Sequence, residues 1–381
     1  MIDHPGLLMS VGAFLLVILP VVFIHELGHY LAGRLFGVGA ETFSIGFGHA
    51  LAGWTDKRGT RWKIGWLPLG GYVKFAGDMN PASQADAAWL ALPAAERNRT
   101  FQAKPVWQRA IIVAAGPAVN FVLALLILAG FALAFGEVRT APVVGGLAPG
   151  GAAAAAGLRP GDRLTAIDGH AVDSFGDIGR AVLLRGGERV TIRYDRGGVS
   201  RATDATIATD VERDRFGNSY PIGRLGIVST APTIVPVGVL KAPLVAARQV
   251  GEIVSLTFET IGRVVTGRVA VGELHGPVGT AKIAGEQLSL GWSAFVFLVA
   301  LVSINLGFIN LLPVPMLDGG HLFFYAVEAV RRRPLAPQVQ EWAFRGGLVA
   351  LLALMLVVTF NDLGAFGLWK NLSQQWAGLI G

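Results

Sequence analysis

Four long apolar stretches alternate with polar sequence along the chain. They cover roughly residues 6–33, 108–136, 292–329 and 346–368. Each is long enough to supply the about 20 apolar residues that a helix needs to cross a bilayer. Pro313 and Pro315 interrupt the third stretch, and proline breaks helices. The pattern therefore predicts four transmembrane helices, the third of them broken.

Composition agrees with a polytopic membrane protein. Of the 381 residues, 52% are hydrophobic and only 15% are charged, whereas a soluble protein has about 25% charged residues. The first apolar stretch lacks a basic leading region and an early cleavage motif, so we interpret it as a retained helix. The chain has no cysteine. This excludes disulfides and thiolate ligands, and any metal must be bound by His, Asp or Glu.

Basic residues are concentrated in two of the loops. The loop between the first two apolar stretches and the loop after the third are rich in them: Lys57, Arg58, Arg61, Lys63, Lys74, Arg97, Arg99, Lys104, Arg331, Arg332 and Arg333. Such loops face the cytoplasm by the positive-inside tendency. We therefore expect both termini and residues 137–290 to be periplasmic. The same tendency accounts for the net charge of +6, so we expect no nucleic-acid partner.

Residues 41–76 contain short β-prone runs separated by glycines. The runs are Thr42–Phe47, Arg61–Leu67 and Tyr72–Phe75, and three tryptophans accompany them. Because tryptophan prefers the membrane interface, we expect a small hairpin sheet that dips into the cytoplasmic leaflet. An ordinary cytoplasmic hairpin is the alternative. Residues 77–104 are polar and Ala-rich and predict a loosely ordered cytoplasmic loop.

Residues 141–230 have the pattern of a soluble α+β insert. It begins with a strand and a short Ala-rich helix that ends at Gly157, continues with strands around Asp168 and a helix, and closes with a hairpin that turns at Gly197–Gly198. Its segment AGLRPGDRLTAIDGHAV, residues 156–172, resembles a PDZ domain. That resemblance implies a groove that binds peptide ends or strands by β-augmentation. Residues 223–227 could form a loop that cradles a carboxylate or a plain closing strand.

The motif His25-Glu26-Leu27-Gly28-His29 lies inside the first apolar stretch. On a helix, positions i and i+4 share a face, so both imidazoles can reach one zinc ion. Glu26 lies beside them, where it can accept a proton from water. An ionised carboxylate at such depth costs about 2.5–3.5 kcal/mol on insertion scales, and metal coordination offsets this cost. The alternative is a histidine pair that is satisfied by polar neighbours.

A catalytic zinc usually has three protein ligands, so one more must come from elsewhere in the chain. We favour Asp318 in NLLPVPMLDGGHLFF, residues 310–324, where prolines and glycines interrupt the helix. Irregular backbone at membrane depth is tolerated where it lines a cavity. His321 and Glu328 are the rival ligands. Asn120 and Asn305 are further polar residues in apolar stretches, and they could either satisfy freed backbone groups or hold helices together.

Several motifs occur in a recognisable order. They are HELGH, GGYVKF (70–75), AGPAVNF (115–121), the PDZ-like insert and SINLGFINLLPVPMLDGGHL (303–322). Together they resemble the site-2 protease family of intramembrane zinc metalloproteases, and above all its bacterial branch of regulator-of-sigma-E proteases. The resemblance covers nearly the whole chain. It departs from the best-known members in having one PDZ domain instead of two, which affects how the periplasmic part of a substrate is screened.

The resemblance implies roles for individual residues. It implies that His25, His29 and Asp318 bind Zn2+ and that Glu26 is the catalytic base. Asn310, Pro313 and Pro315 would bind the unwound substrate, and the sheet of residues 41–76 would capture it as a strand. The implied substrate is a single-pass transmembrane protein of the inner membrane, cleaved inside the bilayer towards the cytoplasmic side. An anti-sigma factor is expected, and remnant signal peptides are another class.

Two rival functions follow from the same motifs. A non-catalytic membrane scaffold could use the PDZ-like domain to recruit envelope proteins, but it would need neither zinc nor Glu26. A metal transporter would need polar residues along a path across the membrane, whereas here they cluster near one side.

The expected organisation is a polytopic α-helical membrane protein with one inserted domain. The first helix carries HExxH, an amphipathic segment follows the insert and lies along the membrane surface, and the third helix carries the LDG motif. In chain order the parts are residues 1–40, 41–106, 107–137, 138–230 (PDZ), 231–290 (amphipathic), 291–330, 331–345, 346–370 and the tail 371–381.

Overall fold

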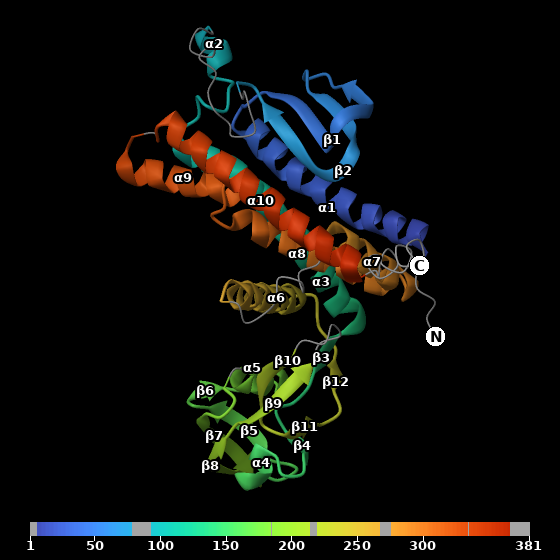
Figure 1. The fold of residues 1–381 in the computed structure, drawn as a ribbon, viewed down its shortest axis with the longest axis vertical. Coiled ribbons are helices and arrows are strands. Elements are labelled where there is room, and N and C mark those ends of the chain that lie inside the picture. The colour runs from blue at the N-terminus through green and yellow to red at the C-terminus, as the bar shows by residue number, and fades with distance from the viewer. Residues whose placement is uncertain are drawn as a thin grey trace, which may run out of the picture. The chain divides into compact units, whose positions relative to one another are not determined.

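A computed structural model describes residues 6–77, 93–183, 185–213, 219–266, 276–333 and 335–365 (Figure 1). Most of the loop expected at 77–104 and the tail expected at 371–381 lie outside these residues. The chain divides into two compact units. The helical unit contains Met1–Ala129 and Ala246–Gly381, and the β-rich unit is Gly130–Val245. Each is described by itself.

Four helices are long and apolar enough to cross a membrane in the described part of the chain. They are α1 (Leu7–Leu35), α3 (Val106–Phe135), α8 (Trp292–Leu311) and α10 (Pro337–Ala365), of which Gln338–Phe360 is the apolar span. The prediction of four spanning helices is confirmed. The protein is therefore an integral membrane protein.

The third apolar stretch is divided as its prolines predict. Helix α8 ends at Leu311, and α9 (Asp318–Arg331) begins after a six-residue link that contains both prolines. The link lies tightly against the start of α9. A Cβ added at Gly319 would be 2.2 Å from the Leu312 carbonyl oxygen, and one at Gly320 would be 2.5 Å from that of Val314. Glycine is thus required where the chain turns back at the LDG motif.

Two long strands, β1 (Ala40–Thr55) and β2 (Arg61–Phe75), replace the three short runs expected between residues 41 and 76. Each strand bends, and different parts of it pair with different neighbours. The segment 42–45 pairs with 71–74 on one side and 61–64 on the other, and 61–65 also pairs with 50–55. Gly46 and Gly48, with φ of +82° and +80°, let β1 bend without ending. The described sheet therefore has two outer segments, 50–55 and 71–75.

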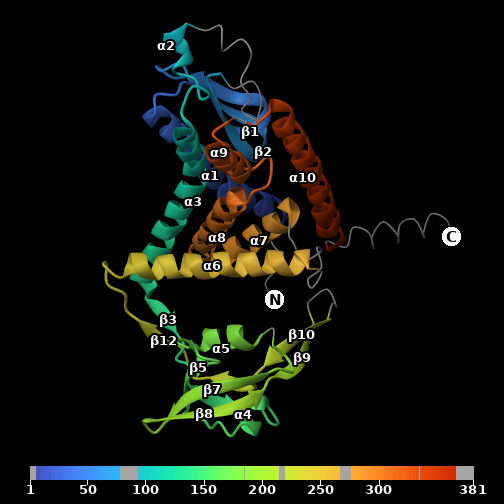
Figure 2. The ribbon, with the colours of Figure 1, turned by 90° about the vertical axis from the view of Figure 1, so that its left-hand side faces the viewer.

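Three further helices complete the helical unit: α2 (Ala94–Arg97), α6 (Ala242–Val265) and α7 (Pro277–Ser289). Figure 2 shows α6 crossing the spanning helices. Ala246 of α6 lies in one apolar cluster with residues of α3 and α8, and Thr257 donates a hydrogen bond to Asn305 Oδ1 at 3.1 Å. Asn305 thus links α8 to α6. Helix α7 lies against α1, in a cluster that includes Val17 and Ala284.

The β-rich unit is built around a four-stranded sheet with the order β6-β5-β7-β8. Leu164, Ile167, Ile178 and Ile192 are among its most buried core residues. Its elements are β3 (Glu137–Arg139), β4 (Val144–Leu147), α4 (Ala152–Ala155), β5 (Arg163–Ile167), β6 (His170–Ala171), α5 (Phe175–Val182), β7 (Arg189–Arg196), β8 (Val199–Thr206), β9 (Ala208–Arg213), β10 (Ser219–Arg224), β11 (Ile227–Ser229) and β12 (Thr233–Val235). Strands β9–β10, β4–β11 and β3–β12 form three further pairs.

Two details refine the expected insert. Around residues 223–227 the chain continues from β10 into β11, and the Leu225 and Gly226 carbonyls accept hydrogen bonds from Ala153 and Ala148. This favours the closing strand over the carboxylate loop. At the other boundary, Thr233–Val235 forms a strand and α6 starts only at Ala242. The β-branched residues of β12 favour the strand, and Pro236 disfavours a helix directly after it.

Asp162 is the most deeply buried carboxylate of the β-rich unit, with 1% of its surface exposed. Arg196 donates two hydrogen bonds to it, from Nε to Oδ1 and from Nη2 to Oδ2, both at 2.7 Å. The backbone N–H of Arg159 donates a third, at 2.7 Å. The Arg196 guanidinium lowers the pKa of Asp162 below its ordinary value. This carboxylate joins the start of β5 to the end of β7.

Candidate metal centre

Three side chains from two distant segments meet inside the helical unit. Helix α1 carries His25 and His29 one turn apart, and their Nε2 atoms are 3.2 Å from each other. Asp318 is the first residue of α9, and its Oδ2 lies 3.1 Å from His25 Nε2 and 3.4 Å from His29 Nε2. The three residues form a group that could hold a metal ion. Almost three hundred positions of sequence separate the imidazoles from the carboxylate.

The spacing of these three atoms fits zinc. Zinc binds histidine nitrogen and carboxylate oxygen at about 2.0–2.2 Å, and tetrahedral geometry then separates neighbouring ligand atoms by about 3.3 Å. The observed separations are 3.1–3.4 Å. Asp318 Oδ2 is also buried without a hydrogen-bond partner in the described residues. Because an unsatisfied buried oxygen is costly, a cation in the middle of the group would stabilise it.

Helix α3 determines how His29 is placed. His29 Nδ1 lies 2.9 Å from the Ile112 carbonyl oxygen, to which an Nδ1–H can donate. A Cβ added at Gly116 would lie 2.2 Å from His29 Nε2, and one at Gly28 would lie 2.5 Å from the Ala115 carbonyl oxygen. The glycines of HELGH and AGPAVNF therefore allow α1 and α3 to approach each other and leave room for the imidazole. The spacing of motifs in the sequence did not predict these contacts. The small residues AAG in α3 could have indicated a close approach of two helices.

Asn120, also on α3, is fully buried and contacts the other histidine. Its Nδ2 lies 3.2 Å from His25 Nδ1. Ser303 of α8 donates a hydrogen bond to the Asn120 backbone oxygen at 2.9 Å. Each histidine of the group thus has a partner on α3 at the nitrogen that points away from Asp318.

Glu26 is 8% exposed and lies against the outer segment of the sheet. A Cβ added at Gly71 would be 2.8 Å from Glu26 Cγ and 3.0 Å from Val22 Cγ1. In both ribbon views β2 lies beside α1 (Figures 1 and 2). In the described residues no further strand pairs with the outer side of 71–75. The outer segment of the described sheet therefore passes beside the glutamate at Gly71.

The remaining predicted residues lie around the link between α8 and α9. Asn310 is in the last turn of α8, and Pro313 and Pro315 belong to the link itself. Helix α10 touches this link, because a Cβ added at Gly347 would be 2.6 Å from the Pro315 carbonyl oxygen. The link, which directly precedes Asp318, is thus packed against the start of α9 on one side and against α10 on the other.

The two rival ligands lie outside the group of His25, His29 and Asp318. The ring centroid of His321 is 4.8 Å from that of Phe344 on α10. Glu328 forms an ion pair with Arg109 of α3, at 2.8 Å. Glu328 therefore connects α9 to α3.

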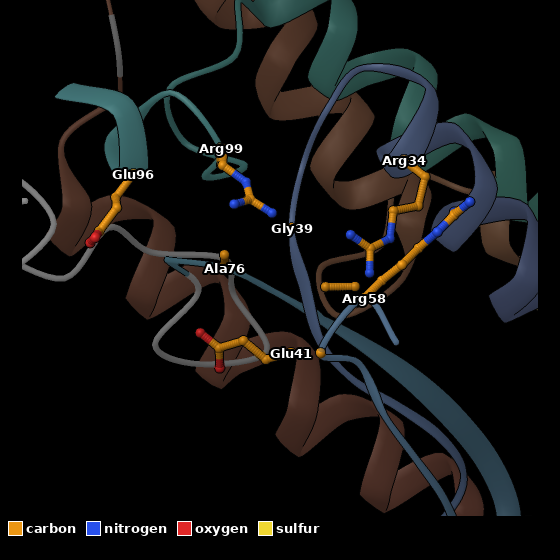
Figure 3. Close-up of a pocket in the computed structure, with 9 residues that line it drawn as sticks. Arg34, Gly39, Glu41, Arg58, Ala76, Glu96 and Arg99 are labelled. Carbon is orange, nitrogen blue, oxygen red and sulfur yellow. The ribbon is translucent and has the colours of Figure 1, made fainter. Parts of the chain in front are cut away.

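A pocket of about 250 Å³ lies elsewhere, where α1 ends and the sheet begins (Figure 3). Arg34, Arg58 and Arg99 are among its lining residues. None of the lining residues belongs to the metal-binding group or is Glu26. The candidate metal centre is therefore separate from this cavity.

Comparisons with known proteins agree with the geometry. The model of peptidase family M50 matches residues 13–354. A protein of Agrobacterium fabrum named "Putative zinc metalloprotease Atu1380" is 44% identical over 357 residues, which cover 92% of this chain and 95% of that protein. The metalloprotease MmpA of Caulobacter vibrioides is 38% identical over 391 residues, covering 96% and 98%.

Among solved structures, the PDZ domain of an SdrC-like protein from Listeria monocytogenes is 24% identical and covers 24% of this chain and 92% of that domain, with a TM-score of 0.19. This score carries no conclusion about the fold. The family match and the curated relatives confirm the resemblance stated for the sequence. The chain belongs to peptidase family M50, and it is a zinc metallopeptidase of the site-2 protease type.

Proposed function

We propose that this zinc metallopeptidase hydrolyses peptide bonds within the transmembrane segments of single-pass membrane proteins, with His25, His29 and Asp318 as its zinc ligands and Glu26 as its general base. The observation that carries the proposal is the convergence of the three ligand atoms beside the outer segment 71–75, with which no further strand pairs in the described residues and whose Gly71 lies close to Glu26. The three metal-binding residues thus lie next to a strand segment that an extended peptide could join.

The proposed roles follow from what each side chain can do. When bound, zinc would supply Lewis acidity toward the scissile carbonyl group and toward water. A Glu26 carboxylate oxygen takes the proton of the attacking water and passes it to the nitrogen of the leaving amine. His25, His29 and Asp318 would hold the metal through two neutral imidazoles and one carboxylate, the number of protein ligands that is usual at a catalytic zinc.

The substrate must be extended before it can react. A transmembrane helix hides its carbonyl groups in i→i−4 hydrogen bonds. The outer side of segment 71–75 can offer replacement hydrogen bonds to an extended peptide. Such a peptide would run past Gly71 and therefore past Glu26. We assign Asn310, Pro313 and Pro315 to the other side of this peptide, since they lie at the end of α8 and in the link that directly precedes Asp318.

The orientation in the membrane follows from the basic loops. If the Arg-rich loops are cytoplasmic, the end of α1 at Leu35 faces the cytoplasm. His29 lies six residues before this end, which is about 9 Å along a helix. The centre would thus lie inside the bilayer of the inner membrane, towards the cytoplasmic side. The sheet of β1 and β2 would enter the cytoplasmic leaflet, and the β-rich unit would be periplasmic.

The substrate class is proposed from the family likeness and the β-rich unit. We expect an anti-sigma factor that has already been cut on its periplasmic side, or alternatively remnant signal peptides. The β-rich unit would act as a PDZ domain that binds peptide ends or strands.

A reconstituted cleavage assay tests the proposal. Wild type and Glu26→Gln are co-reconstituted with a single-pass substrate, and product and zinc content are measured for each. We expect Glu26→Gln to lose cleavage by about 100-fold or more and to keep its zinc. Cleavage at the wild-type rate by Glu26→Gln would contradict the assignment of the base.

A further inference from the structure

The buried side-chain amide of Asn120 faces a histidine of the metal-binding group, and the oxygen of this amide accepts no hydrogen bond from the described residues. Nδ2 lies 3.2 Å from His25 Nδ1, while Oδ1 is buried without a hydrogen-bond partner in the described residues. The residue has 0% of its surface exposed. A buried polar oxygen without a partner costs free energy. The arrangement therefore needs an explanation.

The ligand geometry determines which hydrogen His25 must carry. The Nε2 atoms of both histidines face Asp318 Oδ2, at 3.1 and 3.4 Å. A neutral imidazole that uses Nε2 as a ligand has its hydrogen on Nδ1 and donates it. His29 follows this rule, because the Ile112 carbonyl oxygen lies 2.9 Å from its Nδ1 and can accept. His25 needs an acceptor in the same place.

The Asn120 amide supplies that acceptor after a half-turn about its terminal torsion. The turn exchanges Oδ1 and Nδ2, which are nearly the same size, so no neighbour must move. Oδ1 then accepts from His25 Nδ1–H, and Nδ2 takes the buried position in which Oδ1 has no partner in the described residues. With Nδ2 in that place, two donors would face each other whenever Nε2 of His25 is a ligand.

We propose that Asn120 is a positioning residue for zinc binding, which accepts a hydrogen bond from His25 Nδ1–H and thereby holds the imidazole in the tautomer whose Nε2 binds the metal. The inference rests on the proposed ligand set. It assigns α3 the same task at both histidines, through the Ile112 carbonyl for His29 and the Asn120 side chain for His25. Partners of this kind typically contribute 10–100-fold to metal affinity.

Two substitutions at Asn120 separate this role from a purely structural one. Asn120→Asp keeps an acceptor oxygen and removes the amide donor, whereas Asn120→Leu removes both at similar size. If Asn120 acts as an acceptor, the Asp variant retains zinc affinity and the Leu variant loses it. If Asn120 instead acts through its N–H donor, both variants lose it. Ser303→Ala is the matched control, because it removes a helix-to-helix hydrogen bond at Asn120 without touching the amide.

The measurement is zinc affinity of the purified full-length chain, by titration of the zinc-free protein against a competing chelator. We expect the zinc dissociation constant to rise about 10–100-fold in Asn120→Leu and to stay near the wild-type value in Asn120→Asp and Ser303→Ala. Thermal unfolding of each zinc-free variant is recorded alongside. Where Asn120→Leu does not fold, Asn120→Ala, which also lacks the acceptor, takes its place; wild-type affinity in the variant without an acceptor overturns the proposal. Loss of affinity in Asn120→Asp overturns it.

This outcome differs from a failure of the proposed function. If His25, His29 and Asp318 do not hold zinc, Asp318→Asn will bind zinc as tightly as wild type. If they do hold zinc and only the role of Asn120 is wrong, Asp318→Asn will lose zinc, and either Asn120→Asp will lose it as well or a folded Asn120→Leu will keep it.

Discussion

The β-rich unit and the helical unit each contain a carboxylate with a buried oxygen, Asp162 and Asp318, but they satisfy it in different ways. Asp162 accepts two hydrogen bonds from Arg196 and one from a backbone N–H, so its charge is matched by a permanent cation. Asp318 faces two imidazoles, and its Oδ2 has no hydrogen bond in the described residues. The first arrangement is complete within the chain. The second needs a cation from outside.

If Asp318 binds zinc as proposed, the difference is one between a structural charge and a metal ligand. A carboxylate that joins two strands is best served by a fixed guanidinium. A carboxylate that must bind a metal has to leave its lone pair available, and the fold accepts the cost of an unsatisfied oxygen. The Asp318 side chain is 19% exposed and the Asp162 side chain 1%. The larger difference lies in their partners, which are a guanidinium for Asp162 and two imidazoles for Asp318.

Replacing each carboxylate separately by asparagine should give the largest difference in zinc binding between the two sites. Asp318→Asn should lose zinc and reduce hydrolysis more than the roughly 100-fold that outer partners of a metal site contribute, because a ligand itself is removed. Addition of zinc should raise the melting temperature of wild type and leave that of this variant unchanged. Asp162→Asn serves as the control and should respond to zinc like wild type. A zinc-dependent rise in Asp318→Asn would contradict the ligand role.

A methyl group at Gly116 should produce the next largest effect. The added Cβ would lie 2.2 Å from His29 Nε2, so the imidazole must move. We expect the zinc dissociation constant of Gly116→Ala to rise about 10–100-fold, as when a partner of a metal ligand is lost. Gly130→Ala, on the same helix, is the matched control, since its Cβ would meet nothing within 4 Å. Equal zinc affinity in both variants would show that the contact of Gly116 with His29 does not matter.

A methyl group at Gly71 should affect catalysis and leave the metal in place. Its Cβ would lie 2.8 Å from Glu26 Cγ and would displace the glutamate or the strand edge. Because a shift of about 1 Å can cost up to about 100-fold in rate, we expect Gly71→Ala to cleave about 10–100-fold more slowly with unchanged zinc content. Leu51→Ala, in the outer segment on the other side of the sheet, should cleave like wild type. The account of strand capture fails if Gly71→Ala also does so.

Acid should lower the stability of the β-rich unit, because it protonates Asp162. This effect does not depend on zinc. The folded pKa of Asp162 is lowered, so its contribution to stability is complete above the ordinary pKa of about 3.9 and is lost as the pH falls through the lower folded pKa. At neutral pH we expect Asp162→Asn to reduce the free energy of unfolding of this unit by about 1.5–3 kcal/mol. Hydrogen exchange of the β5 and β7 amides in the full-length chain measures this.

The same exchange experiment at lower pH tests whether the effect depends on the charge of Asp162. The difference in protection between wild type and Asp162→Asn should shrink as the pH falls below about 4. A difference that is constant with pH would mean that the charge of Asp162 does not contribute.

The sequence predicted those features that depend on composition and on local motifs. Long apolar stretches identified the four spanning helices, and the prolines at 313 and 315 identified the break between α8 and α9. HELGH and LDG indicated a metal site because ionisable groups are rare at membrane depth. The roles of His25, Glu26, His29 and Asp318 remain predictions, although the structure brings the three ligand atoms together.

Features that depend on contacts between distant segments could not be predicted. The contact of Gly116 with His29, the approach of Gly71 to Glu26 and the amide of Asn120 at His25 join segments that are tens of residues apart. The bent strands were also missed, because glycines inside β1 indicate interruptions as readily as bends. The contact of α7 with α10 is a further case. Asp362 of α10 accepts hydrogen bonds from Gly276 and Gly279 at the start of α7, which no local pattern reveals.

The proposed centre is one zinc ion that is bound by residues of two distant segments. X-ray absorption at the zinc edge of the purified, active wild-type chain tests this most directly. The account predicts a four-coordinate zinc with two imidazole nitrogens and with oxygen in the other positions, all at about 2.0–2.2 Å. A zinc with fewer than two imidazoles in its coordination shell, or an active preparation without zinc, would contradict it.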